Sequence, residues 1–235
     1  DGREILFSSL RVEKAEYQWR ESEIYAVNVA TRAVRQLTSR KGPDFGPVVS
    51  PDGKMVAYQG YDWTDDTYIT SKLYLMGIDG SNPRRIDGSL DRSPENVSWA
   101  ADGSGVYFLA QDRGQAHLFF AAAAGGEPKR LTSGDQLLSG FSLAPTGTAA
   151  AILNTFDSPG DVVVLDVKAP APRQLTDLNG DVLTGKRLGT LEEIWYPSVG
   201  GLRVQGWIVK PPDFDPSKKY PLMLAIHGGP HGMYA

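Results

Sequence analysis

The chain has 235 residues, of which 41% are hydrophobic and 22% are charged, and its formal net charge is −4. These values are typical of a globular protein, and the acidic balance provides no basic surface for nucleic acid or for an anionic membrane. No apolar run approaches the roughly 20 residues that a membrane helix needs, and the absence of cysteine excludes disulfides and thiolate metal sites. We therefore expect neither a nucleic acid nor a membrane as a partner.

A two-part pattern recurs along most of the chain. "SPDGKMVAYQG" (Ser50–Gly60) and "AADGSGVYFLAQ" (Ala100–Gln111) each place a turn before an alternating apolar strand, and "APTGTAAAILN" (Ala144–Asn154) is a weaker copy. The Asp-Gly pairs begin at positions 1, 52 and 102 and the Thr-Gly pair at 146, so the spacings are 51, 50 and 44 residues. A second strand, a turn and a short third strand follow each copy. Four strands in a unit of ~40–50 residues are one β-propeller blade.

The repeat predicts a mainly β fold in which residues 1–188 form about four blades of four antiparallel strands. We name the strands of a blade A to D in chain order, and we expect each Asp-Gly to form a two-residue A–B hairpin with positive φ at both positions. Asp1-Gly2 would then be an A–B turn, which predicts that the first blade is incomplete and that residues upstream are missing. Complete blades are expected at 43–90, 95–133 and 137–177, forming an open arc, and Asp181–Leu188 could start another strand. The alternative fold is a β-sandwich with irregular turns.

The pattern changes after Leu188, so we predict a second domain over residues 189–235. Two strands, Glu192–Pro197 and Leu202–Lys210, are followed by a proline-rich surface loop. The near-continuous apolar run "PLMLAIH" (Pro221–His227) then predicts a strand buried on both faces, as in an α/β sheet covered by helices. We do not find those helices in this sequence.

The end of this run, His227-Gly228-Gly229-Pro230, matches the place where α/β-hydrolases build half of their oxyanion hole. Glycine allows the backbone to approach a substrate closely and leaves an N–H free to point at the developing oxyanion. Proline stiffens the exit of the loop. An ordinary strand-ending turn would read the same way in isolation.

The segment "EEIWYPSVGGLRVQGWIVKPPDFDPSKKYPLMLAIHGGPHGMYA" resembles the start of the catalytic domain of the prolyl oligopeptidase family of serine peptidases. The branch of acylaminoacyl peptidases and bacterial dipeptidyl peptidases looks most similar, and the upstream blades resemble its propeller. The resemblance implies that the backbone of Gly228 and Gly229 forms part of the oxyanion hole. It also implies that His227 and Pro230 support this loop and that His231 lines it.

The family also implies a catalytic serine, aspartate and histidine, in that order, downstream of the glycine pair. "GFSLA" (Gly140–Ala144) lacks the last glycine of a nucleophile elbow and lies in a strand A, and Ser198 lies in a hairpin turn. We therefore expect no triad in this sequence and no peptidase activity from this chain alone. The parent protein would be a serine exopeptidase that removes acylated amino acids or dipeptides from the N-terminus of short peptides, with the propeller gating access.

Weaker signals concern substrate contact and partners. Tyr61 and Trp63, in a long B–C loop, and His231 are candidates for binding substrate, although solvent loops would look the same. Asp62, Asp65 and Asp66 indicate a solvated acidic turn rather than a calcium loop, and His117 is expected at the surface. No metal or organic cofactor is implied, and a homo-oligomer is possible. Because the chain begins with Asp1, any signal peptide would lie outside it, and the cytoplasm is preferred over the periplasm. A non-catalytic interaction module and an esterase are the alternative functions.

Overall fold

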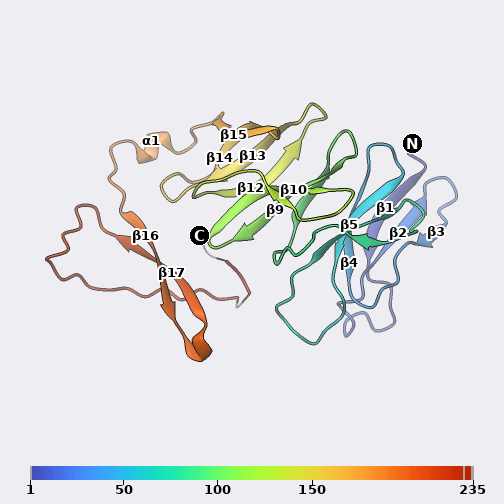
Figure 1. The fold of residues 1–235 in the computed structure, drawn as a ribbon, viewed down its shortest axis with the longest axis horizontal. Coiled ribbons are helices and arrows are strands. Elements are labelled where there is room, and N and C mark those ends of the chain that lie inside the picture. The colour runs from blue at the N-terminus through green and yellow to red at the C-terminus, as the bar shows by residue number, and fades with distance from the viewer. Residues whose placement is uncertain (1, 230, 234–235) are drawn as a thin grey trace.

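The computed structural model describes residues 2–229 and 231–233, and nearly all of its regular structure is strand. Four antiparallel meanders follow one another along the chain, and a separate two-stranded hairpin follows them (Figure 1). The first meander has three strands, β1 (Glu4–Ser9), β2 (Glu23–Asn28) and β3 (Val34–Gln36). The second has four, β4 (Asp44–Val49), β5 (Met55–Gly60), β6 (Lys72–Gly77) and β7 (Arg84–Arg85). These two are the first and second blades that the repeat predicts.

The third and fourth blades are joined into one eight-stranded sheet. The third blade contains β8 (Glu95–Trp99), β9 (Gly105–Asp112), β10 (Gln115–Ala122) and β11 (Lys129–Arg130). The fourth contains β12 (Leu137–Leu143), β13 (Thr148–Asn154), β14 (Asp161–Asp166) and β15 (Ala169–Gln174). A short parallel pairing of Ala116 with Leu137 links strand C of one blade to strand A of the next, and the Ala116 N–H donates to the Gln136 carbonyl at 3.0 Å.

The hydrophobic core lies between neighbouring blades rather than within them. The alternating strands expose one apolar face to each neighbour, so one buried cluster joins blades one and two around Ile24, Val56 and Met76. A second, around Leu75 and Phe108, joins blades two and three, and a third joins blades three and four. The Trp99 indole N–H also donates to the Val48 carbonyl at 2.8 Å, across the boundary between blades two and three.

The predicted turn type was wrong at the Asp-Gly pairs of blades two and three, while Asp1 of the first pair lies outside the described residues. Gly53 and Gly103 have φ of 71° and 70°, but Asp52 and Asp102 keep negative φ. The loop after Ser50 has four residues, because the Ser50 N–H pairs with the Met55 carbonyl and the Gly53 N–H with the Ser50 carbonyl. The aspartate is used through its side chain instead, since Asp52 Oδ1 accepts from the Lys54 N–H at 3.1 Å.

A threonine at the end of strand D ties it to the start of strand C in three blades. The side chains of Thr38, Thr132 and Thr176 accept from the N–H groups of Ile24, Leu118 and Val162 at 2.9, 3.0 and 2.9 Å. The residue before each donor bonds the same hydroxyl, and in blade three this residue is His117. His117 is 1% exposed and also contacts Gln115 Oε1, so the prediction of a surface histidine was wrong.

A linker separates the blades from the hairpin. It contains one helical turn, α1 (Gly180–Leu183), and Asp181–Leu188, which the sequence suggests as the start of another strand, forms none. The hairpin then pairs β16 (Thr190–Pro197) with β17 (Arg203–Lys210) across the short 3₁₀ turn η1 (Val199–Gly201). Both strands agree with the predicted ones to within two residues, whereas the domain boundary between residues 188 and 189 stays a prediction.

The predicted buried strand at 221–227 is not formed. These residues belong to no strand in the described part of the chain, and Leu222, Met223, Leu224 and Ile226 are 80–94% exposed. A strand of a parallel sheet needs hydrogen-bonding neighbours on both sides and helices over both faces. Within residues 2–229 and 231–233 no segment pairs with it, so the run stays extended and unpaired.

Candidate functional site

The candidate oxyanion segment lies beyond the exposed run, with Gly228 and Gly229 both exposed. Gly229 has a φ of +138°, and a Cβ there would lie 3.0 Å from the backbone N of His231, so the position requires glycine. A Cβ on Gly228 would meet nothing within 4 Å. The His227 Nδ1 lies 2.9 Å from the Gly228 carbonyl oxygen, which keeps the imidazole beside the loop. The fourth residue of the motif, Pro230, lies outside the described residues.

His231 contacts the B–C loop of blade two. Its Nε2 lies 3.0 Å from the Thr67 hydroxyl, and its ring centroid lies 6.1 Å from that of Tyr68. The loop between β5 and β6 therefore touches the glycine segment on the side of His231. Thr67 was not singled out as a candidate in the sequence, because nothing in a loop's composition says which distant segment it meets.

The two predicted aromatic candidates of this loop have other neighbours. The Tyr61 N–H donates to the Pro43 carbonyl at 3.3 Å, and the Trp63 N–H donates to the Lys41 carbonyl at 3.0 Å. The Lys41 ammonium lies 4.3 Å from the centroid of the Trp63 ring. These contacts tie the start of the loop to the turn before β4, while its later residues reach His231.

The B–C turn of blade three is a second contact point, which could not be predicted from the sequence. Arg113 and Gly114 connect β9 to β10 with φ of 51° and 75°. Gln205 Nε2 on β17 donates to the Arg113 carbonyl at 3.0 Å, and the Gly114 N–H points at the Met233 sulfur at 3.0 Å. The B–C side of blades two and three thus faces the residues around the glycine pair. Figure 1 shows the C-terminal part of the chain returning to the sheet that contains β9 and β10.

A buried ionic cluster lies between the first two blades. Asp44 is 1% exposed and pairs with Arg40, which also pairs with Asp62 at 2.8 Å. Glu23, at the start of β2, accepts from the Thr38 hydroxyl. Burial raises the pKa of Glu23 to about 7, an effect that the Thr38 hydrogen bond opposes and the Asp44 charge reinforces. Burial likewise raises the pKa of Asp44. No group of three or more histidine or acidic side chains in the described residues is arranged to hold a metal ion.

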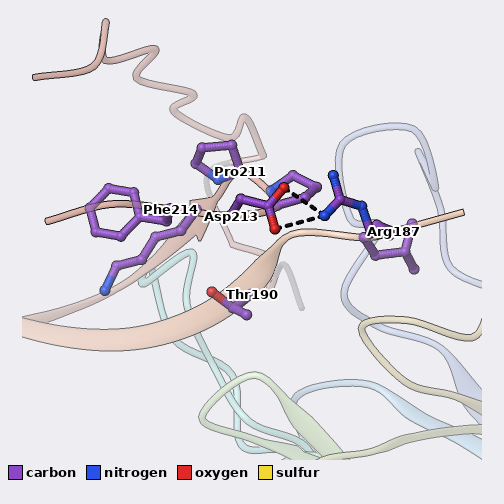
Figure 2. A pocket seen from close by; sticks show the side chains of 8 residues that line it. Arg187, Thr190, Pro211, Asp213 and Phe214 are labelled. Carbon is purple, nitrogen blue, oxygen red and sulfur yellow. Dashed lines mark hydrogen bonds and ion pairs between the residues drawn. The ribbon is translucent and has the colours of Figure 1, made fainter. Parts of the chain in front are cut away.

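A hollow of about 400 Å³ opens where the linker meets the hairpin (Figure 2). Arg187 and Asp213 pair across it at 2.6 Å, and Lys210, which pairs with Glu192, lies 5.1 Å from the Phe214 ring. Its charges are therefore already matched, and none of the residues that line it belongs to the glycine segment. This hollow is a joint between the linker and the hairpin.

The two rejected nucleophiles occupy the places that the sequence predicts. Gly140–Leu143 lie within β12 and Ala144 begins the turn before β13, where no helix starts, and the strand register shifts at Gly140. Ser198 precedes η1 in the turn of the hairpin.

Among the helices of the described residues, none is long and apolar enough to cross a membrane.

Blades with shared cores define a partial β-propeller, and a hairpin and a glycine segment follow them in the chain. Residues 8–182 match the TolB β-propeller domain, and the chain belongs to that family. In sequence it is 26% identical over 232 residues to dipeptidyl-peptidase 5 of Porphyromonas gingivalis, covering 98% of this chain and 34% of the relative. It is 30% identical over 253 residues to dipeptidyl-peptidase 5 of Arthroderma benhamiae, covering 100% of this chain and 34% of the relative.

The fold is also that of a solved peptidase. The acylaminoacyl peptidase of Pyrococcus horikoshii superposes with a TM-score of 0.79 at 23% identity, covering 99% of this chain and 35% of that chain. The chain therefore spans about a third of the length of the relatives that it matches. These similarities confirm the partial propeller and the resemblance to the prolyl oligopeptidase family.

Proposed function

We propose that this chain is part of a serine exopeptidase that releases acylated amino acids or dipeptides from the N-terminus of short peptides. Residues 1–188 would supply propeller blades, and residues 189–235 the first strands of the catalytic domain. The observation that carries the proposal is the exposed Gly228-Gly229 segment, which belongs to no strand and is flanked by contacts with two propeller loops. Relatives named as dipeptidyl and acylaminoacyl peptidases support it.

The role of the glycines follows from the chemistry of acyl transfer. When a serine attacks a peptide carbonyl, negative charge develops on the carbonyl oxygen, and a backbone N–H placed beside it stabilises that charge. Such a donor is worth about 3–4 kcal/mol in related hydrolases. Residues 227–229 are outside any ladder, so the amides of Gly228 and Gly229 are free of sheet pairing. The serine, aspartate and histidine of the triad would come from sequence outside these 235 residues.

The propeller would restrict access to this site. Its B–C loops lie against the segment that carries the glycines, at His231 and at Met233. A peptide would have to pass these loops to place its scissile carbonyl beside the glycine amides. A long or folded chain would be too large to do so. The loop at 61–70 would then border the bound peptide.

The complete product of the gene tests the proposal. We expect it to react with a fluorophosphonate probe and to hydrolyse acyl-amino acid anilides or dipeptide anilides, whereas the 235-residue chain alone should not react. Hydrolysis of simple esters without cleavage of either anilide would indicate an esterase instead. Absence of both labelling and hydrolysis would favour a non-catalytic propeller that binds other proteins.

A further inference from the structure

The Arg113–Gly114 turn is a rigid feature of the third blade. It closes β9 and β10, two eight-residue strands that pair over their full length from Asp112–Gln115 to Gly105–Ala122. Both turn residues have positive φ, as a two-residue turn of type I′ requires. The strands carry Phe108 and Leu118, which are 0% and 1% exposed, so the turn is anchored in the core.

The turn holds β17 through two different contacts. The Gln205 side chain donates to the Arg113 carbonyl at 3.0 Å and to Glu193 Oε1 at 2.7 Å, so one amide joins the hairpin to the blade. Trp207 packs on Gly114 so closely that a Cβ at residue 114 would lie 2.3 Å from its Cζ2 atom. No side chain larger than hydrogen fits there without moving the indole.

The same turn reaches the segment after the glycine pair. The Gly114 N–H lies 3.0 Å from the sulfur of Met233, four residues beyond Gly229. One two-residue turn therefore contacts both the strand that precedes the candidate oxyanion segment and the residue that follows it. The sequence separations are 92 and 119 residues.

We propose that the Arg113–Gly114 turn is a positioning element that sets where the Gly228 and Gly229 amides stand relative to the propeller. The inference rests on the proposed function and adds a residue to it. Oxyanion donors act only over a narrow range of distance, and a misplacement of about 1 Å in related sites costs about 100-fold in rate. A side chain at residue 114 would push Trp207, and with it β17, away from the blade.

Gly114→Ala in the complete gene product tests this, with Gly103→Ala as its matched control. Gly103 lies in the A–B turn of the same blade with a φ of 70°, against 75° for Gly114, and a Cβ there would meet nothing within 4 Å. Both variants carry the same backbone strain, so any difference between them reports the clash with Trp207. We expect Gly114→Ala to lower kcat at least tenfold with little change in KM, and to slow fluorophosphonate labelling in the same ratio. Gly103→Ala should leave both rates within twofold.

Gln205→Ala provides a second variant without backbone strain. It removes the bond to Arg113, and we expect a smaller loss of kcat in the same direction. If Gly114→Ala and Gly103→Ala have equal kcat in an active enzyme, the positioning role is overturned while the peptidase assignment stands. If the unmodified protein neither reacts with the probe nor cleaves substrate, the proposed function fails, and the positioning role fails with it.

Discussion

Replacing Glu23 with glutamine should remove a pH dependence of stability that this side chain creates. Glu23 is 8% exposed, and its carboxylate accepts from the Thr38 hydroxyl within reach of the Asp44 and Arg40 charges. Burial raises its pKa from 4.5 to about 7, with Glu21 adding a smaller repulsion and Arg40 a smaller attraction. A neutral glutamine oxygen can still accept the threonine hydrogen bond.

The sign follows from proton binding. Between pH 4.5 and 7 the folded protein holds a proton on Glu23 that the unfolded chain has already lost, so the free energy of unfolding falls as pH rises through this window. Above pH 7 the ionised Glu23 lowers the free energy of unfolding by its full amount, and below pH 4.5 this destabilisation disappears. A pKa raised from 4.5 to about 7 corresponds to about 3 kcal/mol, an upper limit because neighbouring charges relax.

Urea unfolding at a series of pH values from 5 to 8 measures this effect. We expect Glu23→Gln to gain about 1–3 kcal/mol relative to the unmodified protein between pH 5 and pH 8. The same substitution at the exposed Glu16 controls for the loss of one negative charge. Parallel stability curves for the Glu23 variant and the unmodified protein would refute the argument.

Three further substitutions test the packing and hydrogen bonds of the blades by urea unfolding. Phe108→Ala should cost about 3–5 kcal/mol, because it empties a fully buried position stacked on Phe119, and a smaller loss would show that the blades collapse into the space. Thr132→Val should cost about 1–3 kcal/mol by leaving the buried Leu118 N–H unpaired, while the exposed Thr146→Val should change little. Trp99→Phe should cost about 1 kcal/mol through its lost bond to the Val48 carbonyl, and an unchanged stability would show that this bond adds nothing.

The blades could be predicted because their signals are local and repeated. The Asp-Gly and Thr-Gly marks lie next to the strands that they connect, and strand alternation is read within six to eight residues. The helical turn at Gly180–Leu183 was missed although Gly185, with a φ of 75°, follows it, because four residues carry too little periodicity. The buried environment of His117 was missed for a related reason. Its partner Thr132 is 15 residues away, just after β11.

Only part of the candidate site could be predicted from the sequence. The glycine pair could be found because its residue types carry the chemistry themselves. The Arg113–Gly114 turn could not, since its contacts with Trp207 and Met233 depend on how the hairpin returns to the blades. The run from Leu222 to Ile226 has the composition of an inner strand, but composition cannot supply the neighbouring strands that would bury it.

Because the hydrophobic clusters are shared between neighbouring blades, we expect the blades to separate one at a time, starting from the ends of the arc. In the described residues the hydrophobic clusters lie between blades, so removing one blade exposes the apolar face of the next to water. Blades three and four, joined by the Ala116–Leu137 pairing, should exchange their amide protons for deuterium as one block. Blade one meets its neighbour through a shared side-chain cluster and a backbone hydrogen bond from the Asp44 N–H to the Ser22 carbonyl at 2.7 Å, but no strand pairing joins these two blades in the described residues. Under a pulling force blade one should detach first. The β9–β10 hairpin, whose turn contacts the residues around the glycine segment, should unfold last.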